Sequence, residues 1–344
     1  MKKVKIFHGL VNYGTQAGLI SRELRKKGYD AISVTGYDPF GRISDKTLKH
    51  SGRTVPEKIF NYFFNSIFKL YIFFRYNIFH FYFSQTLTRN QWDLPFYRIL
   101  GKKVVFHYLG ADVQLYKYSL EKYKITNVAY YYKNGPEHDR NVLRRLRRET
   151  RYADLQIVCA PYLSEFVKNS IVIPLAIDLS DFTYYPKENI TDEIIIAHAP
   201  THRGNKGTEF IINAVEQLKK EGFNIKFLLI ENVSHNELKK AYIKCDIFID
   251  QVLIGWYGAA AVEAMAMGRP VICFCREEYY KYIDFGDQIP IINANRDTIL
   301  DILRETLNKR EILPEIGNKS RKFIENIHDV DKITESLISI YRSL

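Results

Sequence analysis

The chain has 344 residues, of which 46% are hydrophobic and 26% are charged, with a formal net charge of +11. This composition is typical of a soluble globular protein, and the length exceeds one typical hydrophobic core, so we expect two domains. No run reaches the roughly 20 apolar residues that span a bilayer, although residues 59–83 come closest. The excess of positive charge indicates an anionic partner, which nucleic acid, an acidic membrane or a phosphorylated substrate would each provide.

The N-terminal segment predicts a strand, a loop and a helix. Residues 4–8 form the predicted strand, and polar residues interrupt its apolar stretch too early for a signal peptide. A glycine-rich loop containing Gly14 and Gly18 leads to a helix over residues 19–27, followed by a second strand over 31–35. Ligands of parallel α/β sheets bind at the carboxyl ends of the strands, so the loop with Gly14 either faces a ligand or is a plain turn.

An aromatic segment follows, with large apolar residues at helical spacing. Its members are Phe60, Phe63, Phe64, Ile67, Phe68, Tyr71 and Phe74, with Lys58, Lys69 and Arg75 nearby. Such a stripe is usually core, but a basic and aromatic helix can also rest on lipid headgroups. Both interpretations stay open at this point.

Further strands are predicted over residues 78–83, 104–108, 153–159 and 171–173, so strands and helices alternate as in a parallel sheet. An arginine-rich helix over 139–152 has Leu143, Leu146 and Thr150 as its expected inner stripe. Its arginines predict a solvated face, because no nucleic-acid-binding motif accompanies them, and we expect no nucleic-acid partner. Cys159, Cys245, Cys273 and Cys275 are expected to be buried, reduced thiols.

The stretch IIIAHAPTHRGNKGTEFIINAVEQL predicts a strand, a polar loop and an amphipathic helix. Arg203 and Lys206 lie in that loop. A cation at a helix N-terminus opposes the helix dipole unless an anion is bound there, which favours a diphosphate site over a solvated turn.

The stretch GWYGAAAVEAMAMGRPV predicts a loop and a helix that begins after Gly258. Its first N–H groups would attract an anion, and Glu263, one turn inside, could reach a ribose. Gly268 and Pro270 end the helix. An ordinary alanine-rich helix with a solvated Glu263 is the alternative.

The longer stretch DIFIDQVLIGWYGAAAVEAMAMGRPVI resembles the donor-site signature of retaining GT-B glycosyltransferases, in particular the family often numbered four. The resemblance implies that Glu263 holds the ribose, that Arg203, Lys206 and Gly207 hold the diphosphate, and that the donor also contacts Gly14, Trp256, Tyr257, Gly258 and Ala259. Eight residues before the position of Glu263 the family carries another glutamate, which grips hydroxyls of the transferred sugar, and there this chain has Gly255. Asp250, Gln251 and Trp256 are candidates for its role.

Two other segments carry the resemblance. VVFHYLGADVQ is similar to the family's His-x-x-Gly-x-Asp segment, which implies that His107 and Asp112 contact the reacting sugar, although a structural histidine is the alternative. IPLAIDLSDF resembles the crossing between the domains. The expected domains are 1–178 on the acceptor side, a linker over 179–192, a nucleotide-sugar domain over 193–328, and a helix over 329–344 that packs on the first domain.

The resemblance, together with the alternation of strands and helices, implies an α/β protein of the GT-B fold, with two Rossmann-like doubly wound domains that face each other across a cleft. The implied activity is transfer of a sugar from a UDP- or GDP-type nucleotide sugar to a hydroxyl of a glycan or lipid-linked acceptor, with retention, in polysaccharide assembly. An inverting transferase, a nucleotide-sugar epimerase and a non-catalytic nucleotide-binding protein are the alternatives. We expect no metal and no cofactor. We also expect a cytoplasmic protein. If the aromatic helix rests on lipid, the protein would lie at the inner face of an acidic membrane.

Overall fold

The structure is a computed structural model that describes residues 4–38, 41–49, 54–188 and 190–344. It contains two compact units. Unit 1 comprises Met1–Gln114, Arg140–Ala176 and Val330–Leu344, and unit 2 comprises Leu115–Asp139 and Ile177–Asp329.

Residues 115–139 therefore belong to unit 2, whereas the sequence analysis assigned them to the N-terminal domain. The reason is a set of contacts distant in sequence. The guanidinium of Arg276 lies 3.9 Å from the centre of the Tyr123 ring and donates a hydrogen bond of 3.0 Å to the carbonyl of Ile125. This segment contains the short helices α4 (Tyr116–Lys122) and α5 (Val128–Tyr131).

The core of unit 1 is a parallel sheet of seven strands in the order β3-β2-β1-β4-β5-β6-β7. These strands are β1 (Lys5–Leu10), β2 (Asp30–Thr35), β3 (Lys46–Thr47), β4 (Ile78–Tyr82), β5 (Lys103–Tyr108), β6 (Leu155–Val158) and β7 (Ile171–Val172). The order reverses direction between β1 and β4, as in the Rossmann fold. The strands predicted from the sequence of this unit are confirmed, with small shifts at their ends.

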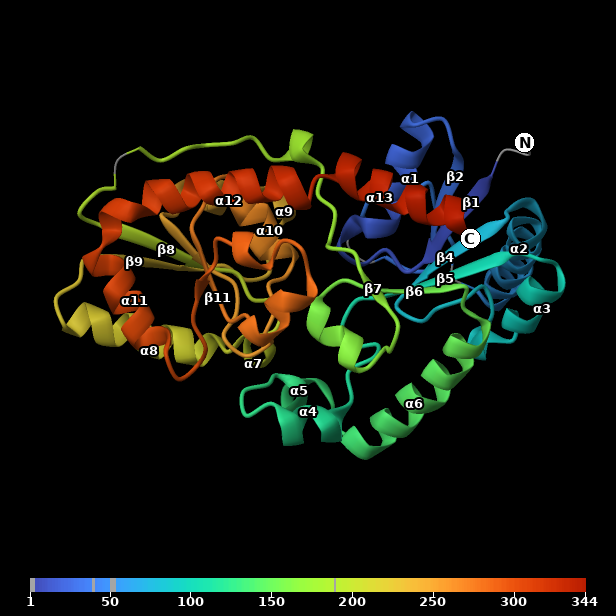
Figure 1. Ribbon diagram of the computed structural model, residues 1–344, viewed down its shortest axis with the longest axis horizontal. Coiled ribbons are helices and arrows are strands. Elements are labelled where there is room, and N and C mark those ends of the chain that lie inside the picture. Colours follow the sequence, from blue (N-terminus) through green and yellow to red (C-terminus); the bar gives the residue numbers. More distant parts are fainter. Residues whose placement is uncertain (1–3, 39–40, 50–53, 189) are drawn as a thin grey trace. The chain divides into compact units, whose positions relative to one another are not determined.

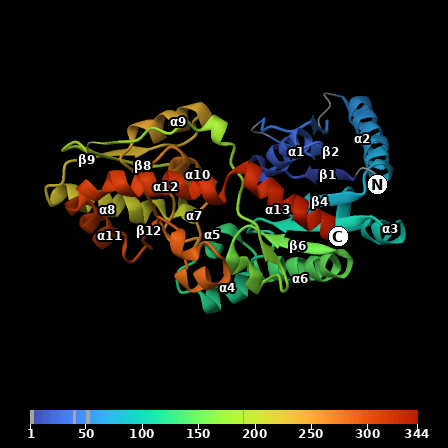
Figure 2. The ribbon, with the colours of Figure 1, turned by 45° about the horizontal axis from the view of Figure 1, so that its top comes forward.

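Helices cover both faces of this sheet, because alternate residues of each strand point to opposite sides. The helices are α1 (Gln16–Lys26), α2 (Val55–Arg75), α3 (Leu94–Ile99), α6 (Gly135–Tyr152) and α13 (Val330–Ser343). α1 and α13 pack side by side on one face, where Leu24 and Leu337 meet Ile78 (Figure 2). On the other face the ring of Phe79 lies 4.5 Å from that of Tyr97 in α3.

The inner stripe of α6 differs from the prediction. Val142 and Glu149 are buried, whereas Leu143 and Thr150 are exposed. Glu149 can enter the core because Tyr108 donates to its carboxylate at 2.9 Å and Gln91 donates to it as well.

Unit 2 has a parallel sheet of five strands in the order β12-β11-β10-β8-β9. The strands are β8 (Ile194–His198), β9 (Ile225–Leu229), β10 (Ile247–Ile249), β11 (Val271–Cys273) and β12 (Ile292–Asn293). Besides α4 and α5, its helices are α7 (Arg203–Lys206), α8 (Thr208–Lys220), α9 (His235–Lys244), α10 (Ala259–Ala266), α11 (Ile299–Asn308) and α12 (Leu313–Ile327). The strand order is doubly wound and reverses direction between β8 and β10.

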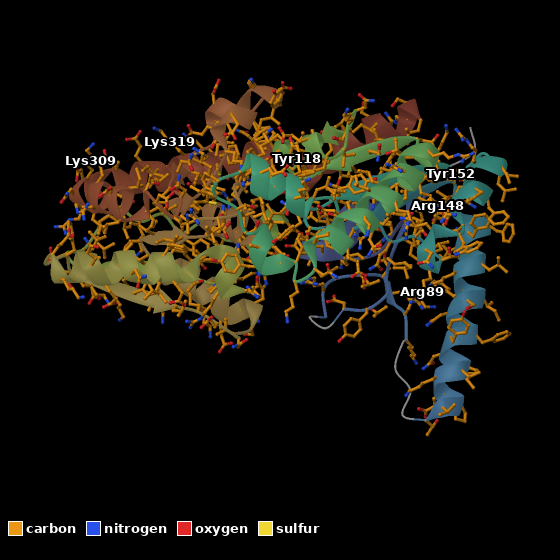
Figure 3. The ribbon with its side chains drawn as sticks, turned by 90° about the horizontal axis from the view of Figure 1, so that it is seen from below. Arg89, Tyr118, Arg148, Tyr152, Lys309 and Lys319 are labelled. Atoms are coloured by element: carbon orange, nitrogen blue, oxygen red, sulfur yellow. The ribbon has the colours of Figure 1, made fainter. Side chains whose placement is uncertain are left out.

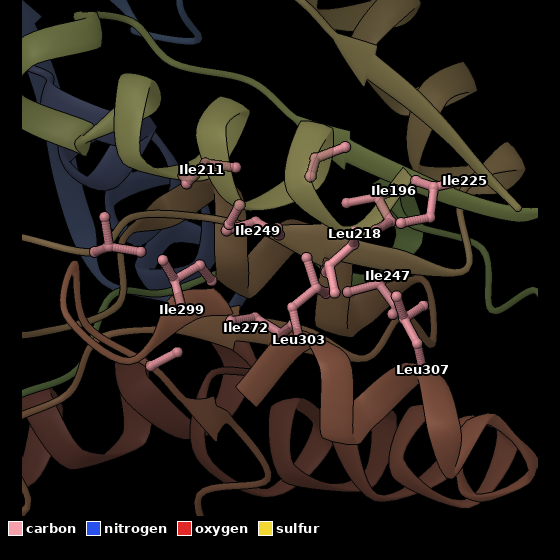
Figure 4. Close-up of a cluster of buried hydrophobic side chains, with 14 of the residues drawn as sticks. Ile196, Ile211, Leu218, Ile225, Ile247, Ile249, Ile272, Ile299, Leu303 and Leu307 are labelled. Carbon is pink, nitrogen blue, oxygen red and sulfur yellow. The ribbon is translucent and has the colours of Figure 1, made fainter. Parts of the chain in front are cut away.

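The helices of unit 2 also lie on both faces of its sheet (Figure 1). α8 and α11 share one face, where Ile211 and Leu303 close over β-strand side chains such as Ile249 (Figure 4). α10 and α12 pack together on the other face. The two units thus confirm the predicted α/β class with two doubly wound parallel sheets.

Candidate functional site

Lys206 is held at the carboxyl end of the unit 2 sheet by the turn that follows it. Gly207 has φ of +74°, and a Cβ there would lie 2.5 Å from a methyl group of Val252, so only glycine fits. The carbonyl of Lys206 accepts a hydrogen bond of 3.0 Å from the N–H of Val252. This contact ties the end of α7, which follows β8, to the loop that follows β10.

Lys206 and the N-terminus of α10 meet at the carboxylate of Asp250. The Nζ of Lys206 lies 2.5 Å from Oδ1, and the N–H of Gly258 donates to Oδ2 at 2.9 Å. Asp250 is only 1% exposed. The structure therefore brings together the two positive features that the sequence analysis expected to share one anion, and it places a carboxylate between them.

The N-terminus of α10 gives this place its preference for negative charge. Gly258 is the N-cap residue and has no side chain to cap the helix, which begins at Ala259. The first helical N–H groups have no acceptor within the helix, and the helix dipole adds a partial positive charge there. The Asp250 carboxylate occupies the position that such a site offers to a phosphate.

The location in the fold has its own significance. Lys206 follows β8, while Asp250 and Gly258 follow β10, and these strands are neighbours on either side of the reversal in strand order. In open α/β sheets the ligand crevice forms at such a reversal, outside the carboxyl ends of the strands.

Glu263 lies one turn into α10 and contacts α9. Its Oε1 is 3.1 Å from Nε2 of His235, and Tyr242 donates a hydrogen bond of 3.3 Å to Oε2. The side chain is about one-fifth exposed, at 19%, so the carboxylate remains accessible. It is oriented by two polar groups, as a residue that binds a hydroxyl pair requires.

His198, at the end of β8, connects the elements that carry Lys206 and Asp250. It contacts the carbonyl of Ile249 at 2.8 Å and the hydroxyl of Thr208 at 2.9 Å, which joins β8, β10 and α8. Burial lowers the pKa of this imidazole to about 4, so it is neutral at physiological pH and adds no charge beneath Lys206.

Arg203 pairs with carboxylates other than Asp250. Its guanidinium donates to Glu231 at 2.6 and 2.8 Å and to Glu209 at 3.3 Å, and this ion pairing holds its pKa above the usual range. A role in diphosphate binding would require exchange of these partners, so the assignment of Arg203 stays a prediction.

Trp256 and Tyr257 are nearly buried inside unit 2. Their rings stack at 5.1 Å, and the hydroxyl of Tyr257 lies 3.1 Å from Nε2 of His328. These side chains pack into the interior of unit 2, while the backbone of the loop leads to Gly258.

Gly255, which stands where the family has its other glutamate, leaves no room for a side chain. Gly255 has φ of +89°, and a Cβ there would lie 1.8 Å from a guanidinium nitrogen of Arg276. Arg276 is 4% exposed and donates to the carbonyl of Ile254 at 2.7 Å. Sequence reasoning missed Arg276, because nothing in its local pattern distinguishes it from a solvated arginine.

Gln251 has a structural role. Its Oε1 accepts from the N–H groups of Leu253 and Ile254 at 2.8 and 2.5 Å, and its Nε2 donates to the carbonyl of Phe274 at 2.7 Å. The side chain thereby shapes the loop between β10 and α10.

In unit 1, His107 lies in the interior of the sheet. His8 on β1, His80 on β4 and His107 on β5 share the face beneath α13. Nδ1 of His107 is 3.2 Å from Nε2 of His80, and burial lowers the pKa of His107 to about 3. This environment favours the structural alternative for His107.

Asp112 shapes the turn after β5. Its Oδ1 accepts from the N–H groups of Leu109 and Gly110 at 3.1 and 2.8 Å, and Arg145 donates to its backbone carbonyl. Burial outweighs these hydrogen bonds and raises the pKa of Asp112 to about 7. A carboxyl group with such a pKa can exchange a proton near neutral pH.

Gly14 lies in the loop after β1, at the reversal in the strand order of unit 1. It has φ of +53°, and a Cβ there would meet only Nε2 of Gln16, at 4.0 Å. Its carbonyl accepts a hydrogen bond of 2.9 Å from Nε2 of Gln16. The same side-chain amide donates to the carbonyl of Ala176 and accepts from the N–H of Ala176. The loop is therefore fixed at the edge of the sheet where a ligand could approach it.

Within the described ranges, no group of three or more His, Cys, Asp or Glu side chains is arranged to hold a metal ion.

No protein-family model matches the sequence, and no curated protein matches it. Solved structures do resemble the fold. Sucrose-phosphate synthase from Thermosynechococcus elongatus is 17% identical with a TM-score of 0.66, and the match covers 99% of both chains. HepE from Anabaena, solved in complex with UDP-glucose, is 13% identical with a TM-score of 0.62 over 98% of this chain and 99% of that one.

A UDP-GlcNAc 2-epimerase from Neisseria meningitidis, bound to UDP-GlcNAc, is 12% identical with a TM-score of 0.54 and covers 99% of both chains. At such identities the likeness concerns the fold alone. Together with the two parallel sheets, it shows that this chain has the GT-B fold.

Proposed function

We propose that the protein is a glycosyltransferase that moves a sugar from a nucleotide diphosphate donor to a hydroxyl acceptor. The observation that supports this most directly is the meeting of Lys206 Nζ and the Gly258 N–H at one carboxylate, at the reversal of the unit 2 sheet. A diphosphate presents the same kind of oxygens, with more charge, to the same two donors. The resemblance of the α10 region to the donor-site signature supports a nucleotide as the group that carries the diphosphate.

In the proposed complex the diphosphate takes over Lys206 and the N-terminus of α10 from Asp250, and Glu263 binds the ribose hydroxyls. During transfer the bond between the anomeric carbon and the phosphate oxygen breaks, and the acceptor oxygen forms a new bond to that carbon. The acceptor proton passes to the departing phosphate. Lys206 and the helix N-terminus stabilise the charge that develops on the leaving group, which is the main contribution asked of the protein.

Retention of the anomeric configuration belongs to the proposal through the sequence resemblance, as do a UDP- or GDP-type donor and a glycan or lipid-linked acceptor. A nucleotide-sugar epimerase is the second candidate, because the Neisseria epimerase has the same fold and was solved with UDP-GlcNAc. Analysis of the products separates the two. An epimerase converts the nucleotide sugar without an acceptor, whereas a transferase releases nucleoside diphosphate only when an acceptor is present.

The donor class can be identified by thermal unfolding with UDP, GDP, ADP and CMP sugars. One ligand should raise the unfolding temperature, since binding at a hundred times Kd stabilises by about 2.7 kcal/mol. If no nucleotide or nucleotide sugar shifts the transition, the proposal fails.

Glu263→Gln tests the position of the nucleotide in the site. The variant should weaken nucleoside diphosphate more than inorganic diphosphate, because only the former has a ribose. Calorimetry with both ligands measures the difference, and equal losses would remove Glu263 from the ribose site.

A further inference from the structure

The helix α2 carries an apolar surface that the described part of unit 1 does not cover. Its two buried residues, Asn65 and Ile72, face the unit. Stepping 100° per residue places eight other side chains on one arc of about 140°. These side chains, here called the α2 patch, are each at least half exposed: Ile59, Phe60, Phe63, Phe64, Ile67, Leu70, Tyr71 and Phe74.

Of the two interpretations of this stripe, burial in the core is thus wrong for most of its residues. Figure 3 shows side chains projecting outward along this helix, and Figures 1 and 2 place it at the rim of unit 1. Surfaces of this kind on soluble proteins rarely exceed a few hundred square ångströms unless they bind something. The helix is also well formed, since Thr54 and Glu57 make a capping box at its start.

The neighbouring helix α3 adds further exposed apolar groups. Its Tyr97 packs against Phe73 of α2 with ring centres 5.0 Å apart. Phe96, Ile99 and Leu100 nevertheless stay at least half exposed, as does Trp92 just before the helix.

Basic groups adjoin the α2 patch. The ammonium group of Lys46 lies 5.3 Å from the centre of the Phe64 ring of the patch and 3.7 Å from that of Phe68. Arg75, which pairs with Asp30 at 2.7 Å, follows at the C-terminal end of the helix. The one acidic side chain of the helix, Glu57, is engaged in the capping box. An apolar, aromatic face with basic flanks complements a surface that is apolar inside and negatively charged at its boundary.

We propose that the α2 patch docks unit 1 onto an anionic lipid bilayer. The helix lies in the interface with its aromatic side chains among the upper acyl chains, while the flanking cations contact lipid phosphates. Within the described residues no helix is long and apolar enough to cross a bilayer, so the mode is lateral. A second copy of the chain fits less well, because self-pairing would appose two basic rims. This inference does not rest on the proposed reaction and can fail or hold without it.

Vesicle sedimentation with the full chain tests the proposal. The protein should sediment with vesicles that mix phosphatidylcholine and phosphatidylglycerol, and less with phosphatidylcholine alone or at high salt. The triple variant Phe60→Ser, Phe63→Ser, Ile67→Ser should lose at least about tenfold in partitioning, since all three side chains leave the interface. As a matched control, Tyr185→Ser, Val233→Ser, Tyr282→Ser replaces three exposed apolar side chains of unit 2 and should bind as the wild type.

Two further measurements make the outcome decisive. The chain has two tryptophans, and Trp256 is buried, so a blue shift of emission with vesicles reports Trp92 and should vanish in Trp92→Phe. Lys46→Gln removes the charge over Phe64 and keeps every side chain of the α2 patch, so it should weaken binding to the mixed vesicles about fivefold, the effect of one surface charge. Absence of wild-type binding, wild-type binding by the serine variant, or equal binding to both vesicle types would overturn the proposal. A dimer that the serine substitutions dissociate, without vesicle binding, would assign the patch to self-association instead.

Discussion

At the residue scale, the candidate site is organised by three groups that already satisfy one another. Asp250 accepts from both Lys206 and the N–H of Gly258, so each charge of the pair has a counter-charge. A buried ion pair of this kind is costly to break from one side only. Substitutions on the two sides of the pair should therefore have opposite effects on anion binding.

Lys206→Ala should weaken nucleoside diphosphate binding by about 1.5 to 3 kcal/mol, the range for hydrogen bonds to charged groups. The alanine removes the cation and leaves the repulsive Asp250 in place. Calorimetry measures the change, and Lys219→Ala, which removes a lysine paired to Glu216 on the exposed side of α8, serves as control. Unchanged affinity in Lys206→Ala would remove this lysine from the site.

Asp250→Asn should strengthen diphosphate binding while it destabilises the free protein. The amide lacks the charge that competes with the ligand, and two unit charges about 4 Å apart interact by about 4 kcal/mol at an effective dielectric constant of about 20. Part of that repulsion is screened, so we expect at least a tenfold gain in affinity and a loss of about 1 to 3 kcal/mol in unfolding free energy. Weaker binding by Asp250→Asn would mean that the carboxylate positions the donors rather than competing for them.

At the scale of elements, the sequence predicted those helices whose ends are set by residues close to them in the chain. The alanine run, Gly268 and Pro270 predicted α10, and the structure has it at Ala259–Ala266. The periodicity of α2 predicted which residues share a face, but not that solvent would lie against it, because a core stripe and a lipid-binding stripe have the same spacing. The inner stripe of α6 was missed because Glu149 is stabilised by Gln91 and Tyr108, which are distant from it in sequence. Arg276 was missed for the same reason, because its contact with Gly255 exists only in the folded chain.

Gly258→Ala separates folding from binding at the start of α10. The residue has φ of −106°, and a Cβ would meet only ordinary contacts, 3.6 Å from Asp250 and 3.8 Å from Lys206. The unfolding free energy should change by no more than about 1 kcal/mol. The methyl group would, however, occupy space beside the ammonium group where a phosphate oxygen must fit, so diphosphate affinity should fall at least about tenfold. Retained affinity in a folded Gly258→Ala protein would place the anion elsewhere.

Gly255→Ala provides the contrasting control on the same loop. Its Cβ would clash with Arg276 and the positive φ disfavours a side chain, so this variant should be clearly less stable than Gly258→Ala in denaturant unfolding. Equal stability of the two variants would contradict the account of this loop.

At the scale of the whole molecule, the two units differ in the titratable groups that they bury. Unit 1 holds His8, His80 and His107 together under α13, where Tyr341 contacts His80 at 2.5 Å. Burial lowers the pKa of His8 and His107 to about 3 and that of His80 well below its usual value. Burial also raises the pKa of Asp112 to about 7 and that of Glu149, which acts in the opposite direction.

The stability of unit 1 should therefore fall as the pH drops below about 6.5, the pKa of histidine in the unfolded chain. At pH values between its folded and its unfolded pKa, each histidine takes up a proton when the unit unfolds. Its contribution to the free energy of unfolding is therefore complete above this pH range and is lost as the pH falls through it. Asp112 and Glu149 offset part of this uptake, which leaves a slope of about 1 to 3 kcal/mol per pH unit. Urea unfolding between about pH 7 and pH 5, followed by a probe in unit 1, measures the slope.

His107→Gln removes one of the groups that take up a proton on unfolding. The variant should therefore reduce the slope of unfolding free energy against pH by about 1.4 kcal/mol per pH unit, whatever its effect on stability at neutral pH. An unchanged slope would show that His107 is already protonated in the folded unit, which contradicts its placement in the interior of the sheet.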